Sequence, residues 1–364
     1  MGMSEKFDYD STSNIIQLDD IVLEYGPGDT LQRQGDTQYL YDANGRLIKK
    51  IEDCDSAEPK VWLFEWDAED QLRSVTTPAG EVWEYKYDAL GRRIVKEGPE
   101  KKVRFVWDGD VVVHEVENEV VNSGWIFEPE SFIPLAKVEN EQLYSVVCDH
   151  LGTPREMVDS EGGIIWSVSY KAWGKVDQVK LQVIDCPIRF QGQYFDAETG
   201  FHYNLFRYYD PNAGKFINQD PIGLLGGDNL YQYVSNPVAW IDPWGLTYEV
   251  SPSRRTHILE GDPPGTGHGP NRGQTMGAFP DTWNDNQAIA AIERTANSPN
   301  STWRQSTGPG VGTITTGGPA PNAPTHNSKG NPVRFEVSGR AYSKTIVAIV
   351  EPVGEKIITG YCKS

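Results

Sequence analysis

A short unit that recurs along the first third of the chain is the strongest constraint on its fold. Each copy contains an aromatic residue, an aspartate, a turn and then a strand-like run, as in YLYDANGRLIKKIE and FVWDGDVVVHEV. A period of roughly 20 residues suits a strand-turn-strand unit repeated along a sheet. The marker aspartates, spaced 25, 21 and 20 residues apart, are Asp42, Asp67, Asp88 and Asp108.

Each unit has the chemistry of a β-hairpin. An aspartate can accept a hydrogen bond from its own backbone two residues later, and glycine supplies the positive φ of a tight turn. Alternation such as Trp83, Tyr85 and Tyr87 places aromatic rings on one face of a strand. With 17 Tyr, 11 Trp, 36 Gly and 24 Pro, the composition also favours short strands joined by turns. We therefore predict a mainly β protein.

Charge divides the chain into two parts. Residues 1–246 carry 22 Lys+Arg and 43 Asp+Glu, a net charge of −21, whereas residues 247–364 carry 11 and 9, a net charge of +2. An acidic body repels nucleic acid, while a slightly basic part tolerates it. A length of 364 residues also exceeds one ordinary domain.

The spacing of the cysteines and the hydropathy of the chain predict which structural features it lacks. The four cysteines are far apart and form no CxxC pair, so we expect reduced structural thiols and neither a zinc site nor a disulfide framework. We expect no membrane span and no signal peptide at the N-terminus, so any export depends on sequence outside this chain.

Two longer segments resemble the conserved end of the core of Rhs proteins, whose YD repeats the hairpin units also resemble. They are DHLGTPREMVDSEGGIIWSVSYKAWGKV at Asp149–Val176 and the segment Arg189–Leu246, which begins RFQGQYFDAETG. The resemblance implies a β-shell that encloses a toxin, of which only the last repeats are present here. It predicts a repeat segment at residues 1–188, a core-terminal region at 189–246 and a C-terminal toxin domain at 247–364.

The pentapeptides DPIGL at Asp220 and DPWGL at Asp242 stand 17 residues apart. Two carboxylates held close together can share a proton and act as an acid/base pair on a water molecule. Asp-Pro followed by Gly is also a good turn, and from the residues alone the turn is the better interpretation. The Rhs resemblance instead implies self-cleavage after Leu246 by Asp220 and Asp242. Alternatives at this site are Asp210 and Asp228, with Arg207 as a residue that tunes a neighbouring carboxylate.

Composition changes after Leu246, where THILEGDPPGTGHGPNRGQT begins. His257 and His268 flank a Gly/Pro-rich segment whose turns can bring both rings toward one cleft. Such a pair suits metal-free RNA cleavage, in which one imidazole deprotonates the ribose 2′-OH and one imidazolium protonates the departing 5′-oxygen. Two histidines in a loop could equally be metal ligands or surface residues. His326 lies in the Gly/Pro-rich stretch 308–332, which is expected to be a mobile loop, and is left out.

Residues 247–364 resemble the bacterial EndoU family of toxin ribonucleases. The matching features are HILEGD, GTGHG, FPDTWNDNQAIAAIERTANSP and the terminal KIITGYCKS. The resemblance implies a small α+β, RNase A-like domain that cleaves RNA at uridine without a metal ion and leaves a 2′,3′-cyclic phosphate. It assigns acid/base roles to His257 and His268 and places Thr359 and Tyr361 in the site. Thr266 and Cys362 depart from the family's usual glycine and proline, which leaves substrate fit open.

Three cations are candidates for phosphate contact: Arg272, Lys344 and Lys356. A guanidinium can hold two phosphate oxygens, although a solvated loop arginine is an equal alternative for Arg272. Apolar positions at helical spacing predict a helix at Asn286–Ala296, with Phe279 and Trp283 as core candidates. Strands are expected at Val333–Val337, Thr345–Val350 and Lys356–Tyr361.

These features favour an interbacterial toxin that is released from its shell by self-cleavage and cuts RNA. The alternatives are a self-cleaving shell that carries a toxin of another activity, and a purely structural repeat protein. The resemblance implies a cognate immunity protein, delivery by type VI secretion with the missing N-terminal core, and action in the target-cell cytoplasm after synthesis in the producer cytoplasm. We expect no cofactor, with assistance from a divalent ion left open.

Overall fold

The computed structural model describes most of the first two thirds of the chain and the secondary structure of the last third. The described residues are 5–129, 131–223, 229–234, 236–238, 240–246, 252–260, 278–280, 283, 285–297, 301–307, 309, 311–316, 327–329, 331–341, 344–351 and 356–363. The chain separates into two compact units, residues 1–223 with 228–246 and residues 224–227 with 247–364.

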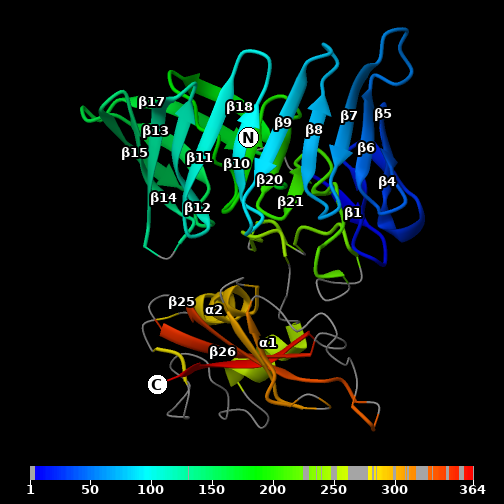
Figure 1. Cartoon of the computed structure of the whole chain (residues 1–364), viewed down its shortest axis with the longest axis vertical. Helices are drawn as coiled ribbons and strands as arrows, with labels where there is room; N and C mark the ends of the chain where they lie inside the picture. Colours follow the sequence, from blue (N-terminus) through cyan, green and yellow to red (C-terminus); the bar gives the residue numbers. More distant parts are fainter. Residues whose placement is uncertain are drawn as a thin grey trace. The chain divides into compact units, whose positions relative to one another are not determined.

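The first unit is dominated by one 18-stranded antiparallel sheet in which each strand pairs with the next along the chain (Figure 1). A single 3-10 turn, Pro27–Asp29, interrupts the described meander. The strands are β1 (Phe7–Tyr9), β2 (Ile15–Leu18), β3 (Ile21–Tyr25), β4 (Leu31–Gln34), β5 (Thr37–Tyr41), β6 (Leu47–Glu52), β7 (Lys60–Trp66), β8 (Leu72–Thr76), β9 (Val82–Tyr87), β10 (Arg93–Glu97), β11 (Lys102–Asp108), β12 (Val111–Glu117), β13 (Val120–Phe127), β14 (Pro134–Glu139), β15 (Gln142–Cys148), β16 (Pro154–Val158), β17 (Ile164–Tyr170) and β18 (Val176–Gln182).

The turns between these strands have the predicted chemistry. The Asp42 carboxylate accepts hydrogen bonds from the backbone N–H groups of Asn44 and Arg46 at 2.9 and 3.0 Å, and Gly45 has a φ of 74°. Asp67, Asp88 and Asp149 repeat the same pair of bonds two and four residues on. The interpretation of these aspartates as turn residues is therefore confirmed for three of the four markers. Asp108 instead ends β11 opposite Val111 in a tighter hairpin.

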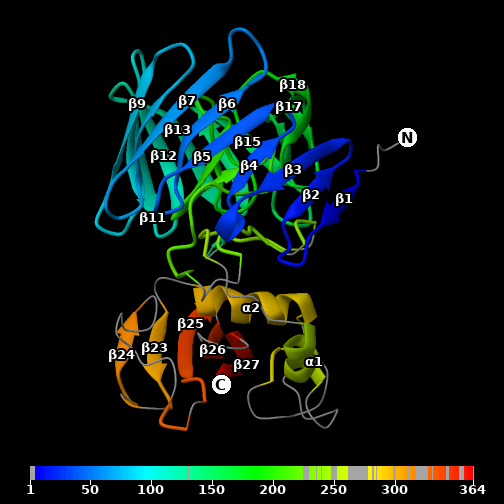
Figure 2. The same cartoon turned by 90° about the vertical axis from the view of Figure 1, so that its right-hand side faces the viewer.

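A second sheet of four short strands fills the hollow of the first, which curves around it (Figure 1, Figure 2). Rings and aliphatic side chains from both sheets form one core, in which Phe64 stacks on Phe201 with 5.6 Å between ring centroids. Burial of such aromatic area is the main stabilising contribution to this unit. The strands are β19 (Tyr194–Asp196), β20 (Phe201–Asn204), β21 (Arg207–Asp210) and β22 (Lys215–Phe216).

A buried ionic cluster joins the two sheets. The Arg93 guanidinium, 0% exposed, holds both carboxylate oxygens of Asp196 at 2.6 and 2.9 Å. Lys96 Nζ lies 2.9 Å from both Asp196 and Glu198. The two cations and the two carboxylates pair with one another, so the cluster links β10 of the large sheet to the short segment of the small sheet that begins with β19.

The second unit is a five-stranded antiparallel sheet in the order β24-β23-β25-β26-β27, with two described helices. Apolar side chains of the second helix, α2, pack on one sheet face, where Gly360 allows the close approach of Ile292. The first helix, α1, packs against β27. The elements are α1 (Pro252–Glu260), α2 (Asp285–Asn297), β23 (Thr302–Gln305), β24 (Ile314–Thr316), β25 (Phe335–Ala341), β26 (Lys344–Glu351) and β27 (Lys356–Lys363).

The mainly β prediction is confirmed, and so are the predicted helix and the three strands of the last third, with bounds that differ by at most four residues. Phe279 is buried as expected, and Trp283 stacks on it with 5.7 Å between ring centroids. Two interpretations were wrong. His257, expected in a loop, lies on α1, and the stretch 308–332 contains β24.

Candidate functional site

The two DPxGL motifs of the first unit meet at one guanidinium. Arg207 Nη2, on β21, lies 3.1 Å from Asp220 Oδ2 and 3.1 Å from Asp242 Oδ2. All three side chains are at most 3% exposed. The Phe216 ring lies under the guanidinium, 3.6 Å from its Cζ to the ring centroid. The structure therefore brings the two predicted carboxylates together and places the predicted tuning arginine between them.

The segment 242–246 is held by its backbone against the β20–β21 turn. Asn204 Nδ2 donates to the Asp242 carbonyl at 2.8 Å, and Phe206 N donates to the Trp244 carbonyl at 3.3 Å. Arg207 Nε donates to the Gly245 carbonyl. The segment itself forms a turn, in which Gly245 N donates to the Asp242 carbonyl at 3.3 Å, so these contacts fix the turn of the second motif. Here the held segment ends at the predicted cleavage point.

Leu246 contacts the Asp242 carboxylate directly. Its backbone N–H donates to Asp242 Oδ1 at 2.9 Å, and its side chain is 9% exposed in an apolar cluster with Phe132, Leu205 and Trp244. Leu246, whose carbonyl belongs to the predicted scissile bond, is therefore held by a hydrogen bond between its own N–H group and a carboxylate. Residues 247–251 lie outside the described residues.

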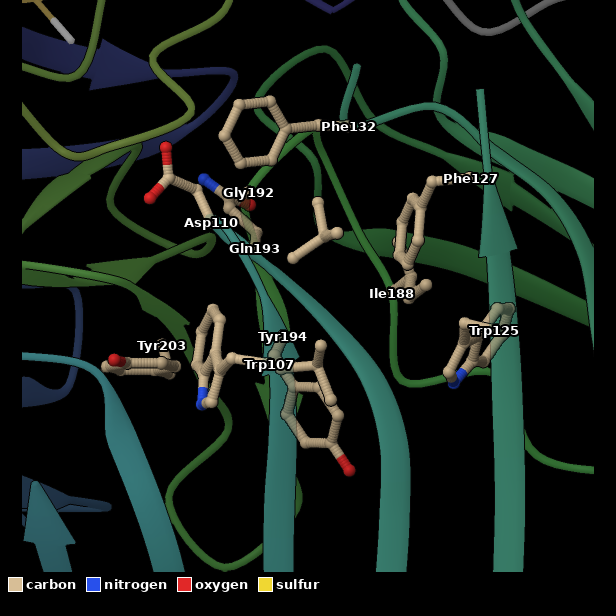
Figure 3. A pocket seen from close by; sticks show the side chains of 12 residues that line it. Trp107, Asp110, Trp125, Phe127, Phe132, Ile188, Gly192, Gln193, Tyr194 and Tyr203 are labelled. Atoms are coloured by element: carbon tan, nitrogen blue, oxygen red, sulfur yellow. The ribbon is translucent and has the colours of Figure 1, made fainter. Parts of the chain in front are cut away.

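Trp244, the variable residue of the second motif, is anchored at both ends of its ring system. Its Nε1 donates to Asp110 Oδ2 at 3.0 Å, and its ring packs edge-on against Phe132 with 5.2 Å between centroids. Asp110 and Phe132 also line an apolar cavity of about 40 Å³ between β11, β12, β13 and residues 188–194 (Figure 3). The cluster that contains Trp244 adjoins this cavity at Phe132, and the cluster and cavity together are called the seat of the second motif.

The second DPxGL motif can lie close to residues 188–194 only because residue 192 is a glycine. Its φ is 83°, and a Cβ built there would lie 1.9 Å from the Pro243 carbonyl oxygen. Because backbone rather than a flexible side chain fills that space, the second motif reaches its position only beside glycine. Sequence reasoning missed Gly192, Asn204 and Trp244, since their roles depend on contacts between segments far apart in the chain.

A buried tyrosine lies next to the second carboxylate of the pair. Burial, followed by the charge of Asp242, raises the pKa of Tyr233, whose hydroxyl accepts a hydrogen bond from Asp242 N at 3.4 Å. Of the alternative carboxylates, Asp210 accepts hydrogen bonds from Tyr39 and from the backbone of Asn212. Asp228 lies outside the described residues.

In the second unit, His257 lies half-buried on α1, beside the buried Ile258 and Leu259. The strand against which α1 packs, β27, carries Thr359 and Tyr361, which are also half-buried. Burial, followed by the charge of Glu336, raises the pKa of Tyr361. Three of the four predicted catalytic residues therefore belong to two elements in contact.

The remaining predicted residues are placed less completely. His268 and Arg272 lie outside the described residues. Lys344 aligns with Ala341 at the start of β26, and the alternation of the strand puts it on the sheet face opposite to Thr359 and Tyr361. Lys356 begins β27 opposite Glu351.

Two further features concern cofactors and membranes. Among the described residues, no group of three or more His, Cys, Asp or Glu side chains is arranged to hold a metal ion. The described helices α1 and α2 are too short and too polar to span a bilayer.

A family model described as Teneurin YD-shell matches residues 1–237. Double-stranded DNA deaminase toxin A of Burkholderia cenocepacia (strain H111) is 37% identical over 288 residues, covering 68% of this chain and 20% of that protein. Probable deoxyribonuclease RhsA of Dickeya dadantii (strain 3937) is 36% identical over 226 residues, covering 59% of this chain and 16% of that protein. The chain thus spans about a fifth or less of the length of these relatives.

Among solved structures, the chain titled "Crystal Structure of TcdB2-TccC3-Cdc42" is 18% identical with a TM-score of 0.41, covering 66% of this chain and 17% of that chain. The family model ends at residue 237, so residues 247–364 lie beyond it. The Rhs-like repeats predicted a shell protein of this kind. Because the match extends over well more than half of the sequence, the chain belongs to the Teneurin YD-shell family.

Proposed function

We propose that this chain is the C-terminal part of an interbacterial Rhs toxin whose last unit is an endoribonuclease. The observation that carries the proposal is the contact between α1, which bears His257, and β27, which bears Thr359 and Tyr361. Relatives of the first unit include proteins named as a DNA deaminase toxin and a probable deoxyribonuclease, so this family's shells accompany enzymes that act on nucleic acid.

The chemistry proposed is transphosphorylation at uridine. One of His257 and His268 accepts the proton of the 2′-OH, whose oxygen attacks the adjacent phosphorus. The P–O5′ bond breaks, and the other histidine, as imidazolium, donates a proton to the departing 5′-oxygen. Hydroxyls of Thr359 and Tyr361 are suited to bind the phosphate or the uracil. The products carry a 2′,3′-cyclic phosphate and a 5′-hydroxyl.

Replacing the attacking group in the substrate tests the reaction. The full chain should cut an RNA oligonucleotide that contains one uridine, and should leave the same oligonucleotide intact when that nucleotide is 2′-deoxyuridine. Cutting of both oligonucleotides would contradict the proposal and would favour a toxin of another activity. The variant His257→Ala should be inactive, whereas Lys329→Ala, on an exposed turn, serves as the matched control.

We also propose that Asp220 and Asp242, held together by Arg207, hydrolyse the Leu246–Thr247 peptide bond. One guanidinium balances one of the two carboxylates, and a proton shared by the pair would balance the other. The ionised carboxylate accepts a proton from water as its oxygen attacks the Leu246 carbonyl carbon. The protonated carboxylate then donates to the Thr247 nitrogen as the C–N bond breaks.

Mass spectrometry of the purified chain tests the self-cleavage. We expect a fragment that ends at Leu246 and a second that begins at Thr247. Both Asp220→Asn and Asp242→Asn should leave the chain intact, while Asp159→Asn, in an ordinary turn, should not affect cleavage. A chain that stays whole, or variants that cleave normally, would contradict the assignment and leave the alternative of a structural repeat protein.

A ribonuclease must be neutralised in the cell that makes it, so we propose a cognate immunity protein. An acidic surface would complement a site that binds phosphate. We also propose that type VI secretion components and the preceding Rhs core deliver the toxin to the target-cell cytoplasm.

A further inference from the structure

The sheet of the second unit has one covered face and one partly open face. The covered face carries Phe335, Val337, Ile346 and Ala348, all at most 4% exposed and packed under α2. Residues directly opposite one another across an antiparallel sheet share a face. Tyr361 and Thr359 therefore lie on the other face, in rows with Val347 and Ile349.

A row of three polar residues crosses this second face next to Tyr361. Arg340 on β25 pairs with Thr345 on β26, which pairs with Lys363 on β27. All three side chains are exposed. With strands spaced about 4.8 Å apart, the Cα atoms of Arg340 and Lys363 lie roughly 10 Å from each other across Thr345. Lys363 is two residues beyond Tyr361, a step of about 7 Å along the strand.

Charge on this face is unevenly placed. Two rows further along the same face, Glu336 on β25 lies directly opposite Arg304 on β23, so an acidic residue there has a basic neighbour. The Arg340–Thr345–Lys363 row contains no acidic residue, and it ends beside the tyrosine of the proposed site. Residues 1–246 carry a net charge of −21, so an anion that binds this chain is drawn to its second unit.

We propose that Arg340, Thr345 and Lys363 bind a phosphate of single-stranded RNA next to the phosphate that is cleaved. The row would hold a backbone phosphate between two long cationic side chains, with the threonine hydroxyl as a further donor. This inference rests on the proposed ribonuclease. It makes the substrate a chain of several nucleotides rather than a dinucleotide.

Binding of a 2′-deoxyoligonucleotide tests the row without requiring cleavage. We expect the full chain to bind a labelled deoxyuridine decamer in a fluorescence anisotropy titration at low salt. The double variant R340Q/K363Q should weaken binding at least tenfold, and it should flatten the dependence of log K on log salt by about 0.7 for each lost phosphate contact. K329Q, which removes an exposed lysine elsewhere in this unit, is the matched control.

Two results would overturn the proposal: no binding by the wild-type chain, or equal affinity and salt dependence for the wild type and R340Q/K363Q. A second arm compares cleavage of an RNA decamer with cleavage of the dinucleotide UpA. The double variant should raise KM for the decamer by a larger factor than KM for UpA, and equal factors would contradict a site for a second phosphate. If no RNA is cut but decamer binding still depends on the row, the ribonuclease proposal fails while the phosphate site stands.

Discussion

The Arg207 side chain joins three stretches of chain that lie far apart in the sequence. Its guanidinium contacts Asp220, Asp242 and the Gly245 carbonyl, and it is 1% exposed. A planar fork with several donors suits such a convergence, whereas an ammonium provides a single point charge. The residue therefore serves both as counterion of the acidic pair and as a holder of the segment before the proposed cut.

Changing Arg207 should separate these roles. Arg207→Lys keeps a charge but loses the fork, so we expect self-cleavage to slow at least tenfold. Arg207→Met leaves two buried carboxylates without their counterion, which should lower the free energy of unfolding by about 3–5 kcal/mol. Urea denaturation and time-resolved electrophoresis measure the two effects. Normal cleavage in Arg207→Lys would contradict the proposed role of the fork.

Lys215 should make the stability of the first unit depend on pH. Burial lowers its pKa to about 7, against the opposing charges of Asp29 and Asp10. Between about pH 7 and the ordinary lysine pKa, the unfolded chain binds this proton and the folded chain does not. The free energy of unfolding should therefore rise with pH in this window, by up to about 1.4 kcal/mol per unit.

Denaturant midpoints at pH 6.5, 8 and 9.5 measure this slope. Lys215→Met should remove the contribution of Lys215 and raise stability most at the lowest pH, where the charged form is otherwise buried. Lys329→Met, an exposed control, should leave the slope in place. Parallel pH profiles for the wild type and Lys215→Met would show that the ammonium is not destabilised by burial.

At the scale of elements, periodic patterns were predictable and long-range contacts were not. The apolar spacing of Ala288, Ile289 and Ile292 predicted α2, and Asp-x-x-Gly turns predicted the hairpins, because both signals are local. Helix α1 was missed because its sequence, PSRRTHILE, is polar and followed by Gly and Pro. The meeting of Asp220 with Asp242 was expected only from family resemblance, since the contacts that hold each motif come from other segments, such as the β20–β21 turn for Asp242, and have no local signature.

The seat of the second motif depends on close packing at Gly192. Gly192→Ala adds a Cβ against the Pro243 carbonyl and also strains a φ of 83°. We expect self-cleavage to fall at least tenfold because the segment 242–246 shifts. Gly80→Ala carries a similar φ of 80° but meets nothing within 4 Å, so it controls for strain alone. Equal cleavage rates in the two variants would contradict a role for the close contact.

At the scale of the whole molecule, the two units have separate cores and separate proposed activities, self-cleavage in the first and RNA cleavage in the second. The core of the first unit includes the Arg93 cluster and the aromatic side chains of both its sheets. The second unit buries its own core between α2 and its five-stranded sheet. Damage to one core should therefore leave the other unit's activity intact.

Arg93→Met tests this independence. It leaves Asp196 paired with Lys96 alone among the cations described above and should destabilise the first unit by about 3–5 kcal/mol. Differential scanning calorimetry should show two transitions, of which only one moves to lower temperature. Ribonuclease activity below that transition should be unchanged. A single transition that shifts as a whole would show that the units unfold together.

The central claim, a metal-independent ribonuclease in the last unit, is tested most directly by the chemical nature of the product ends. The full chain is incubated with uridine-containing RNA in EDTA, and the fragments are identified by mass spectrometry. We predict 2′,3′-cyclic phosphate and 5′-hydroxyl ends, absent with His257→Ala. Fragments with 5′-phosphate ends, or RNA that stays intact both in EDTA and after divalent ions are restored, would contradict the account.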